Sequence, residues 1–284
     1  MTRAAAPVLV GLACAAHACV LFRAAPVPCK TADDCPGGVA CSDAGFCAAD
    51  AVVDAGATGD PVVLAQDEFA HSVPDGFGSA LVGGVWRCAG ATGVYSVGAA
   101  VGSMTNPGTQ NPEGVGCAVL DGTPALDVDV AVRVVNVANA SEGERALAFI
   151  ATRADIGSRH DYRLEASVGT STTVVSLSQD VNDASRVAIG GGSGTATSLA
   201  RPPFHLRFRV ENTAPPSLMG KIWADGDVEP AAWTVSGADL FVPLNQPGAV
   251  EIGHEVHAVR SITTAWGDFV VRDATRFGAD ELLP

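Results

Sequence analysis

The sequence predicts an all-β protein: a two-sheet antiparallel sandwich with a disulfide-rich module at its N-terminus. Three observations lead to this prediction. Apolar and polar residues alternate over about eight positions in several places, Gly, Pro, Asn and Asp separate these stretches, and none shows a helical period. Period-two alternation is typical of strands with one face on a core, and many short strands in succession favour a sandwich. The length of 284 residues suits one such domain of roughly 200–250 residues with small appendages.

The first element, residues 1–23, is predicted to be an export signal or membrane anchor. Arg3 precedes an apolar run, and Ala16-His17-Ala18 supplies small residues at the spacing of a cleavage site. The run is also long enough for an uncleaved anchor, and lipidation at Cys14 or Cys19 is a third alternative. All three alternatives place the mature chain outside the cytoplasm, as a secreted, periplasmic or cell-surface protein.

The second element is a cysteine-rich module at 24–48. Its cysteines recur every six residues, and in an exported chain such an even, closely spaced set predicts disulfides, because so short a segment cannot bury a core. Four cysteines allow three pairings; we favour 29–41 with 35–47. A zinc site is the alternative, although zinc sites usually use closer pairs. The residues are Cys29, Cys35, Cys41 and Cys47.

A linker at 49–62, rich in Ala, Gly and Asp, leads to the sandwich at 63–278 and a tail at 279–284. The clearest strands are 126–134, 161–168 and 204–211, in which apolar residues share one face and charged residues share the other. In this domain we expect Cys88 and Cys117 to form one disulfide. Further strands are expected at 94–104, 146–153, 172–178, 185–189, 218–224, 232–235, 248–258 and 264–272.

Several segments resemble bacterial extracellular domains of the concanavalin A-like (laminin G-like) jelly-roll group. KIWADGDVEPAAW (221–233) is similar to a hairpin of that group, and DEFAHSVPDGFGSALVGGVW (67–86) is similar to its opening strand, with Phe77 where Trp is expected. WGDFVVRD (266–273) resembles the closing strand, which the resemblance places beside the first. The cysteine module resembles small EGF-like units of bacterial surface proteins. The resemblance implies a jelly-roll fold of the concanavalin A-like type.

The candidate cofactor is a structural calcium ion. Asp67 and Asp268 lie on the first and last expected strands, which the resemblance brings together, and related jelly rolls often hold Ca²⁺ through carboxylate and carbonyl oxygens there. The alternative is that both are hydrogen-bonded turn carboxylates. His254 shares an apolar strand face, so we expect a core histidine and no zinc site.

The candidate ligand-binding surface is one charged sheet face around an indole. A Trp ring among planar hydrogen-bond donors suits a sugar or an anionic glycan. The alternative is a solvated, salt-bridged face on which Trp223 covers an apolar patch. We expect the other tryptophans, Trp86, Trp233 and Trp266, in the core or at its rim. If the strands are neighbours, the face carries Trp223, Lys221, Arg207, Arg209, Arg163 and Arg153, with Glu165 beside them.

Charge and carboxylate spacing limit the function. The net charge of −14 argues against nucleic acid, whose phosphates need basic patches. Glu251 and Glu255 lie about 13 Å apart along one strand, which is beyond the roughly 5–10 Å of glycosidase carboxylates. Neighbouring Asp127 and Asp129 have a better spacing, but we interpret them as outward strand carboxylates. The sequence therefore favours a non-catalytic protein.

We expect an exported protein of the cell surface or envelope that binds a polysaccharide or surface partner through one sheet face. Contact with a membrane is expected only through the N-terminal segment or a lipid anchor. The alternatives are a purely structural surface protein and a glycan hydrolase or lyase with unrecognised catalytic residues.

Overall fold

The structure of the chain is a computed structural model, which describes residues 40–41, 47–48, 62–89, 94–106, 114–138, 145–155, 160–169, 173–181, 185–190, 195–197, 202–257 and 261–276. It divides into two compact units, Met1–Ala57 and Thr58–Pro284. In the first unit, β1 (Ala40–Cys41) pairs antiparallel with β2 (Cys47–Ala48), and Cys41 lies opposite Cys47 in the register. The export signal, Cys29, Cys35 and the tail lie outside the described residues, so these predictions and the domain boundaries stay predictions.

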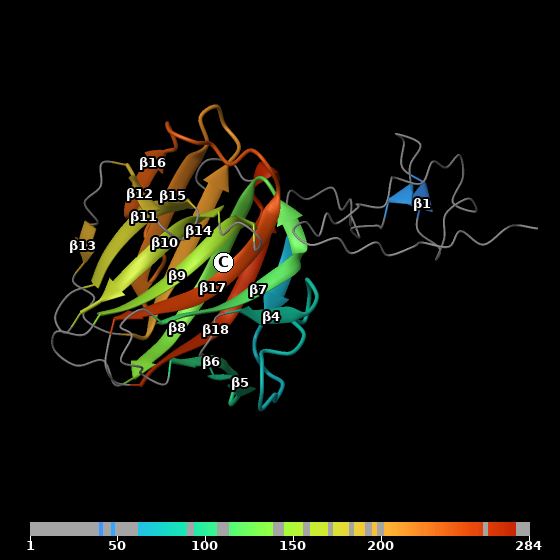
Figure 1. Cartoon of the computed structure of the whole chain (residues 1–284), viewed down its shortest axis with the longest axis vertical. Helices are drawn as coiled ribbons and strands as arrows, with labels where there is room; N and C mark the ends of the chain where they lie inside the picture. Colours follow the sequence, from blue (N-terminus) through green and yellow to red (C-terminus); the bar gives the residue numbers. More distant parts are fainter. Residues whose placement is uncertain are drawn as a thin grey trace, which may run out of the picture. The chain divides into compact units, whose positions relative to one another are not determined.

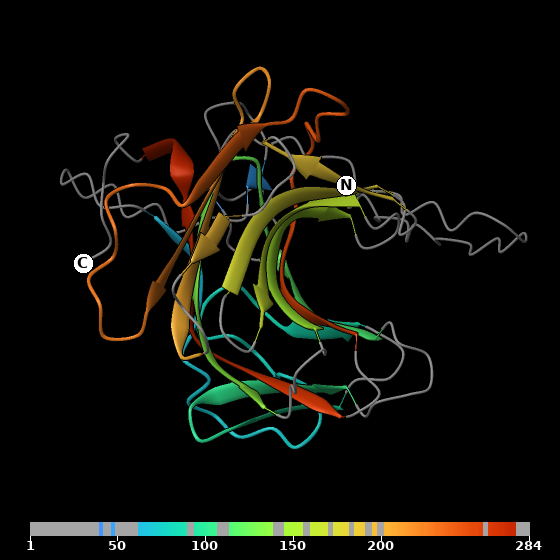
Figure 2. The same cartoon turned by 90° about the vertical axis from the view of Figure 1, so that its left-hand side faces the viewer.

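The second unit consists of two antiparallel sheets that face each other (Figure 1). We call sheet I the sheet in which the strands follow the order β12-β11-β10-β9-β17-β7-β4, with β13 beside β11. The bounds are β4 (Trp86–Ala89), β7 (Gly114–Ala125), β9 (Arg145–Asp155), β10 (His160–Val168), β11 (Thr173–Val181), β12 (Ser185–Ile189), β13 (Thr195–Thr197) and β17 (Gly248–His257). Its strands curve strongly, and its outer face is concave (Figure 2).

We call sheet II the sheet with the order β16-β15-β14-β8-β18-β6-β5, in which β3 pairs with β18. The bounds are β3 (Val63–Asp67), β5 (Val94–Gly98), β6 (Val101–Asn106), β8 (Val128–Ala138), β14 (Phe204–Glu211), β15 (Ser217–Ala224), β16 (Val235–Ala238) and β18 (Ile262–Asp273). One short 3₁₀ turn, Ala274–Arg276, follows β18. In the described part of the chain, no helix is long and apolar enough to cross a membrane.

The inner faces of both sheets form one apolar core, and its residues are those that the alternation places inward. Apolar side chains of the core alternate with polar ones along β8, β10 and β14; examples are Val130, Leu164 and Phe208, which are all 0% exposed. Burying a side chain of this size stabilises a fold by roughly 1.5–3 kcal/mol. Trp86 and Trp266 are also buried in this core, as predicted. The predicted two-sheet antiparallel jelly-roll sandwich is therefore confirmed.

One observed strand differs from the expected one, and the pairing of another agrees with the expectation. The expected strand 94–104 is two strands, β5 and β6, joined at Ala99 and Ala100, where φ is 54° and 58°. Two consecutive left-handed residues are the geometry of a tight type I′ hairpin turn. The closing strand β18 pairs with β3, with Phe269 opposite Asp67, as the resemblance implies. Phe77 is fully buried and packs edge-on against Trp86, with ring centroids 6.0 Å apart.

His254 on β17 links the two sheets from within the core. It is 0% exposed, and its Nδ1 lies 3.0 Å from Oγ1 of Thr264 on β18. Burial lowers the pKa of His254 to about 4, because a charged imidazolium would lose its hydration there. The prediction of a core histidine is confirmed.

Candidate functional site

The structure divides the predicted ligand-binding face between the two sheets. Arg207 and Arg209 lie on β14, and Lys221 and Trp223 lie on β15, all in sheet II. Arg153 and Arg163 lie on β9 and β10 in sheet I, as does Glu165. The expectation of a single face is wrong, because alternation shows which residues of a strand share a face but not which strands share a sheet.

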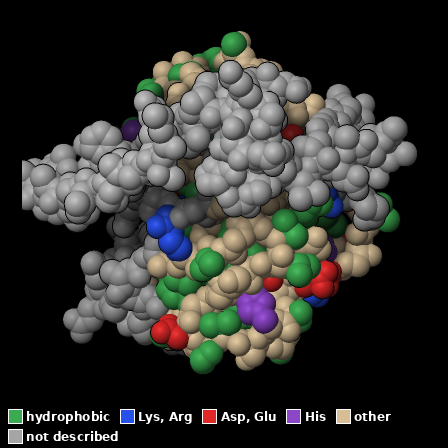
Figure 3. All heavy atoms as spheres, turned by 90° about the vertical axis from the view of Figure 1, so that its right-hand side faces the viewer, with side chains coloured by type: hydrophobic (Ala, Val, Ile, Leu, Met, Phe, Trp, Pro, Cys, Tyr) green, Lys and Arg blue, Asp and Glu red, His purple; other side chains and the backbone are tan. Residues whose placement is uncertain are grey.

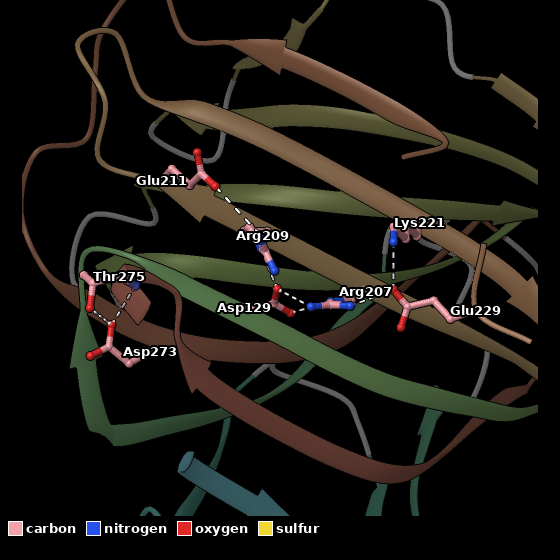
Figure 4. Close-up of polar contacts among 8 residues, drawn as sticks. All are labelled: Asp129, Arg207, Arg209, Glu211, Lys221, Glu229, Asp273 and Thr275. Atoms are coloured by element: carbon pink, nitrogen blue, oxygen red, sulfur yellow. Dashed lines mark hydrogen bonds and ion pairs between the residues drawn. The ribbon is translucent and has the colours of Figure 1, made fainter. Parts of the chain in front are cut away.

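On sheet II, three of the predicted cations belong to a buried ion-pair cluster (Figure 4). Nε and Nη2 of Arg207 donate to the two carboxylate oxygens of Asp129, at 2.8 and 2.9 Å, and Nε of Arg209 donates to Oδ2 of Asp129 at 2.6 Å. Nη1 of Arg207 and Nζ of Lys221 both donate to Oε1 of Glu229, at 2.6 and 2.8 Å. Glu229 comes from the segment 225–234 that joins β15 to β16.

Trp233, from the same segment, lies over these cations. Its ring centroid is 4.6 Å from Nζ of Lys221, and 5.4 and 5.7 Å from the guanidinium carbons of Arg209 and Arg207. The three cations are at most 3% exposed. Burial alone would lower the pKa of Arg207, but the hydrogen bonds and charges of Asp129 and Glu229 outweigh it and raise the pKa. We call these six residues the cationic cluster: Asp129, Arg207, Arg209, Lys221, Glu229 and Trp233.

Two residues farther along β14 and β15, a row of partly exposed side chains lies on the same face of sheet II. Trp223, His205 and Arg133 lie opposite one another on β15, β14 and β8. The rings of Trp223 and His205 stack with centroids 5.0 Å apart and planes inclined by 10°. Nη2 of Arg133 donates to Oδ2 of Asp225 at 2.7 Å, and Nε2 of His205 lies 3.0 Å from Oδ1 of Asp225. We call Trp223, His205, Arg133 and Asp225 the Trp223 row.

The Trp223 row combines an aromatic surface with a hydrogen-bond donor, Arg133, and a hydrogen-bond acceptor, Asp225. The side chains of Arg133, Asp225 and His205 are 26–30% exposed, and Trp223 is partly exposed. The hydrogen bond from Arg133 lowers the pKa of Asp225, which keeps this carboxylate charged and able to accept. Of the row, only Trp223 was in the predicted set. Alternation could have identified both other ring or cation neighbours: His205 shares the face of Arg207, and Arg133 lies on the outward face of 126–134.

On the outer face of sheet I, Arg163 is also buried and paired. Its Nε and Nη2 donate to the two oxygens of Asp161 at 2.7 and 2.8 Å, and its Nη2 lies 3.3 Å from Asp180 on β11. The guanidinium carbon lies 4.5 Å from the centroid of the Phe149 ring. Arg163 is 5% exposed, and its guanidinium is occupied by contacts with Asp161 and Phe149.

Arg186, which was not predicted as a site residue, connects three strands across the concave face. From β12 it reaches Glu165 on β10, with Nη1 2.9 Å from Oε1, and Glu255 on β17, to which Nη2 donates at 2.7 Å. Burial raises the pKa of Glu165, although the charges of Arg186 and Arg163 partly offset it. The two carboxylates thus share one guanidinium. No local sequence pattern predicts this contact, because it depends on the curvature of the sheet.

Arg153, near the end of β9, is held by backbone carbonyls. Its Nε donates to the Leu126 oxygen at 2.9 Å, its Nη1 donates to the Leu244 oxygen, and its guanidinium carbon lies 5.6 Å from the Tyr162 ring centroid. Arg153 has a φ of 53° beside a register shift and is 3% exposed. Burial lowers its pKa. This arginine joins two connecting segments to sheet I.

The residues expected to hold calcium do not fit a calcium site. Asp67 is 2% exposed, and its two oxygens accept hydrogen bonds from the Phe69 backbone N–H at 2.8 Å and from Nε1 of Trp86 at 2.7 Å. Asp268 is exposed, and Nη1 of Arg133 lies 3.9 Å from its carboxylate. Ca²⁺ needs six to eight converging oxygens. Among the described residues, no group of three or more His, Cys, Asp or Glu could hold a metal ion.

The expected disulfide between Cys88 and Cys117 is not formed: both residues are thiols in the structure. In the pairing of β4 with β7, Cys88 lies opposite Ala118, the residue after Cys117. Successive residues of a strand point to opposite faces, so the two sulfur atoms lie on opposite sides of sheet I. Burial raises the pKa of the Cys88 thiol.

No family model matches the chain, and no curated protein sequence matches it. Solved structures with a similar fold include the carbohydrate-binding module CBM66 from Bacillus subtilis (11% identity, 65% of this chain and 94% of the module, TM-score 0.44). Others are the Emp47p carbohydrate recognition domain (11%, 74% and 97%, TM-score 0.42) and a protein of unknown function from Shewanella oneidensis MR-1 (10%, 78% and 90%, TM-score 0.41). At these values the similarity carries no information about a ligand of this chain.

Proposed function

We propose that this chain is a non-catalytic binding protein whose Trp223 row recognises a glycan. The observation that carries the proposal is the stack of Trp223 on His205, 5.0 Å apart, beside the exposed ion pair of Arg133 and Asp225. An indole offers an apolar surface for the C–H face of a sugar ring, and a guanidinium and a carboxylate bind neighbouring hydroxyls as donor and acceptor. The site combines these functions within three adjacent strands.

The charges around the row favour a neutral glycan over an anionic one. The cations expected to attract an anion, Arg207, Arg209 and Lys221, are buried and bonded to Asp129 and Glu229. At the row itself, the positive charge of Arg133 is balanced by Asp225, and Asp268 lies 3.9 Å from Arg133. A sugar with several free hydroxyls therefore suits this surface better than a sulfated or uronic acid polymer.

The wider setting in the proposal is a cell-surface or envelope protein. It would be exported by the segment 1–23, as a laminin G-like sandwich preceded by an EGF-like module paired as 29–41 and 35–47. What supports export is the apolar run after Arg3 with Ala16-His17-Ala18. A purely structural surface protein is the alternative, and it predicts no glycan ligand at all.

The test is a glycan array screened with the chain and then with Trp223→Ala. We expect the substitution to lower the affinity for the bound glycan about five- to twelvefold, since stacking on an aromatic ring contributes about 1–1.5 kcal/mol. The melting temperature should change little, because Trp223 is only partly buried. Array signals should persist in a chelator, since the described carboxylates do not converge on a cation.

The matched control is Trp233→Ala, which removes the same side chain from the cationic cluster. This variant should lose about 2 kcal/mol or more of stability, because Trp233 contacts three buried cations. The glycan affinity of its folded fraction should be unchanged. The proposal fails if Trp223→Ala binds every array ligand as well as the unsubstituted chain does, or if no glycan binds the unsubstituted chain.

A further inference from the structure

The segment between β16 and β17 exposes three consecutive large apolar side chains. Leu240, Phe241 and Val242 are 76%, 71% and 58% exposed. The only charged residue in 236–248 is Asp239, which is 0% exposed. The exposed surface of this segment therefore carries no charge, and its three large exposed side chains are apolar. We call Leu240, Phe241 and Val242 the apolar tip.

Buried hydrogen bonds fix the conformation of the segment that carries the apolar tip. Oδ2 of Asp239 accepts from the Tyr162 hydroxyl at 2.7 Å, and Oδ1 accepts from the Phe241 backbone N–H at 2.9 Å. The same hydroxyl accepts from the Leu244 N–H at 2.8 Å, and the Gln179 side chain donates to the Val242 oxygen at 2.7 Å. A buried carboxylate, hydroxyl and amide are costly unless satisfied by such partners. These hydrogen bonds fix the backbone of the segment, so that the side chains of the apolar tip project into solvent from a well-defined position.

The size of the apolar tip points away from a protein partner. Three side chains of this kind offer on the order of 300 Å² of apolar surface, whereas a stable protein interface buries about 1,200–2,000 Å² in total. Shallow insertion into a lipid bilayer requires much less, because a few apolar side chains partition into the region between headgroups and acyl chains. A rigid support helps here, since little conformational freedom is lost on binding.

From this geometry we propose that the apolar tip inserts into the interfacial region of an electrically neutral lipid bilayer. The uncharged surface of 236–248 crosses a layer of zwitterionic headgroups without leaving a charge in the acyl region. The chain carries a net charge of −14, so anionic membranes would repel it. This inference concerns a different surface from the Trp223 row and stands independently of glycan binding.

The first experiment measures partition into phosphatidylcholine vesicles by co-sedimentation. It uses the unit Thr58–Pro284, which contains both complete sheets and the main core and excludes the apolar run near the N-terminus. The double variant Leu240→Ser/Phe241→Ser should lower the partition coefficient by at least about tenfold, since each side chain gains from leaving water. Phosphatidylserine vesicles should bind the unsubstituted unit less than phosphatidylcholine vesicles do. Circular dichroism checks that the variant is folded.

The matched control is a second group of exposed apolar residues on β3, β5 and the segment before β4. Figure 3 faces the side of the molecule on which β4 lies, and apolar side chains are spread over its described surface. Leu81→Ser/Val85→Ser removes two side chains that are 72% and 62% exposed, and it should leave the partition unchanged. The second group comprises Val63, Leu81, Val82, Val85 and Val94.

The second experiment places a probe at the tip in the full chain. Tryptophan fluorescence of Phe241→Trp should be quenched by doxyl-labelled phosphatidylcholine more than that of the unsubstituted chain, and Val85→Trp should show no such excess. The proposal is overturned if the unsubstituted unit does not partition, if the Leu81/Val85 variant loses as much binding as the tip variant, or if the tip substitutions dissociate a dimer in solution.

Discussion

The cationic cluster and the Trp223 row lie on the same strands and the same face of sheet II, yet one is buried and the other is open. Arg207 and His205 are two residues apart on β14, as are Lys221 and Trp223 on β15. Arg207 and Lys221 donate hydrogen bonds to Glu229, and the ring of Trp233 lies over them. His205 and Trp223 have no such cover and remain partly exposed. The connection 225–234, and not the strand pattern, therefore decides which outward residues are buried in ion pairs.

The two regions differ in energy for the same reason. Charges in the cationic cluster have left water and depend on their partners, so removing one partner leaves an uncompensated buried charge. The ion pair of Arg133 and Asp225 is partly solvated and screened by salt, so its contribution to stability is small. Loss of a partner should therefore cost much more stability in the cationic cluster than in the Trp223 row.

Asp129→Ala should be the most damaging single change to the cluster. Asp129 is 0% exposed and accepts three hydrogen bonds, two from Arg207 and one from Arg209. Its loss should lower the free energy of unfolding by about 3–5 kcal/mol, measured by urea denaturation at neutral pH. The control is Asp227→Ala in the exposed turn after β15, which should change stability by less than about 0.5 kcal/mol. Similar losses from the two variants would mean that burial does not separate the regions.

His254 extends the comparison to a buried group that must stay neutral. Its pKa is about 4 in the fold, against 6.5 for an ordinary imidazole. Between these values the unfolded chain binds more protons, so the free energy of unfolding falls as the pH is lowered from about 6.5 to about 4. The full loss is about 3 kcal/mol at 1.36 kcal/mol per pKa unit. Above about pH 6.5 this contribution is complete.

Other groups also titrate between about pH 4 and 6.5, so the effect of His254 is measured by comparing the unsubstituted chain with a variant that lacks it. Burial raises the pKa values of Asp161 and Glu165, and these carboxyl groups act in the opposite direction. His254→Gln keeps a polar side chain near Thr264 but cannot titrate. Urea denaturation at pH 7.5, 6 and 5 should show a weaker pH dependence in the variant than in the unsubstituted chain. Equal slopes would exclude His254 as a source of acid sensitivity.

The sequence predicted the fold well because the alternation within one strand is enough to identify the strand and its inward face. The inward residues of β8, β10 and β14 were assigned correctly, and the pairing of β18 with β3 followed from the resemblance. Strands with a weak pattern were missed, such as β7, whose run Gly114–Ala125 is rich in small residues. Periodicity carries little signal where side chains are small.

The candidate site was harder to predict because it depends on which strands become neighbours. Arg163 and Arg207 have the same pattern in sequence, but they lie on different sheets. Trp233 was expected in the core or at its rim, yet it covers cations on the outer face, because the segment before β16 returns across β15. Asp225 follows β15 directly, but its bonds to Arg133 and His205 span 92 and 20 residues and leave no local signal.

Asp225→Asn in the Trp223 row should have only a small effect on stability. The carboxylate is 30% exposed and bonds to two side chains that are also partly exposed, so its loss should cost about 0.5–1 kcal/mol or less, and less still in high salt. If the Trp223 row binds a sugar, this variant should nevertheless lose affinity severalfold, because an amide accepts hydroxyl hydrogen bonds more weakly than a carboxylate. Urea denaturation and glycan titration of the same samples measure the two effects. A large loss of stability without a loss of affinity would show that Asp225 serves the fold as Asp129 does, and the contrast between the two regions would then disappear.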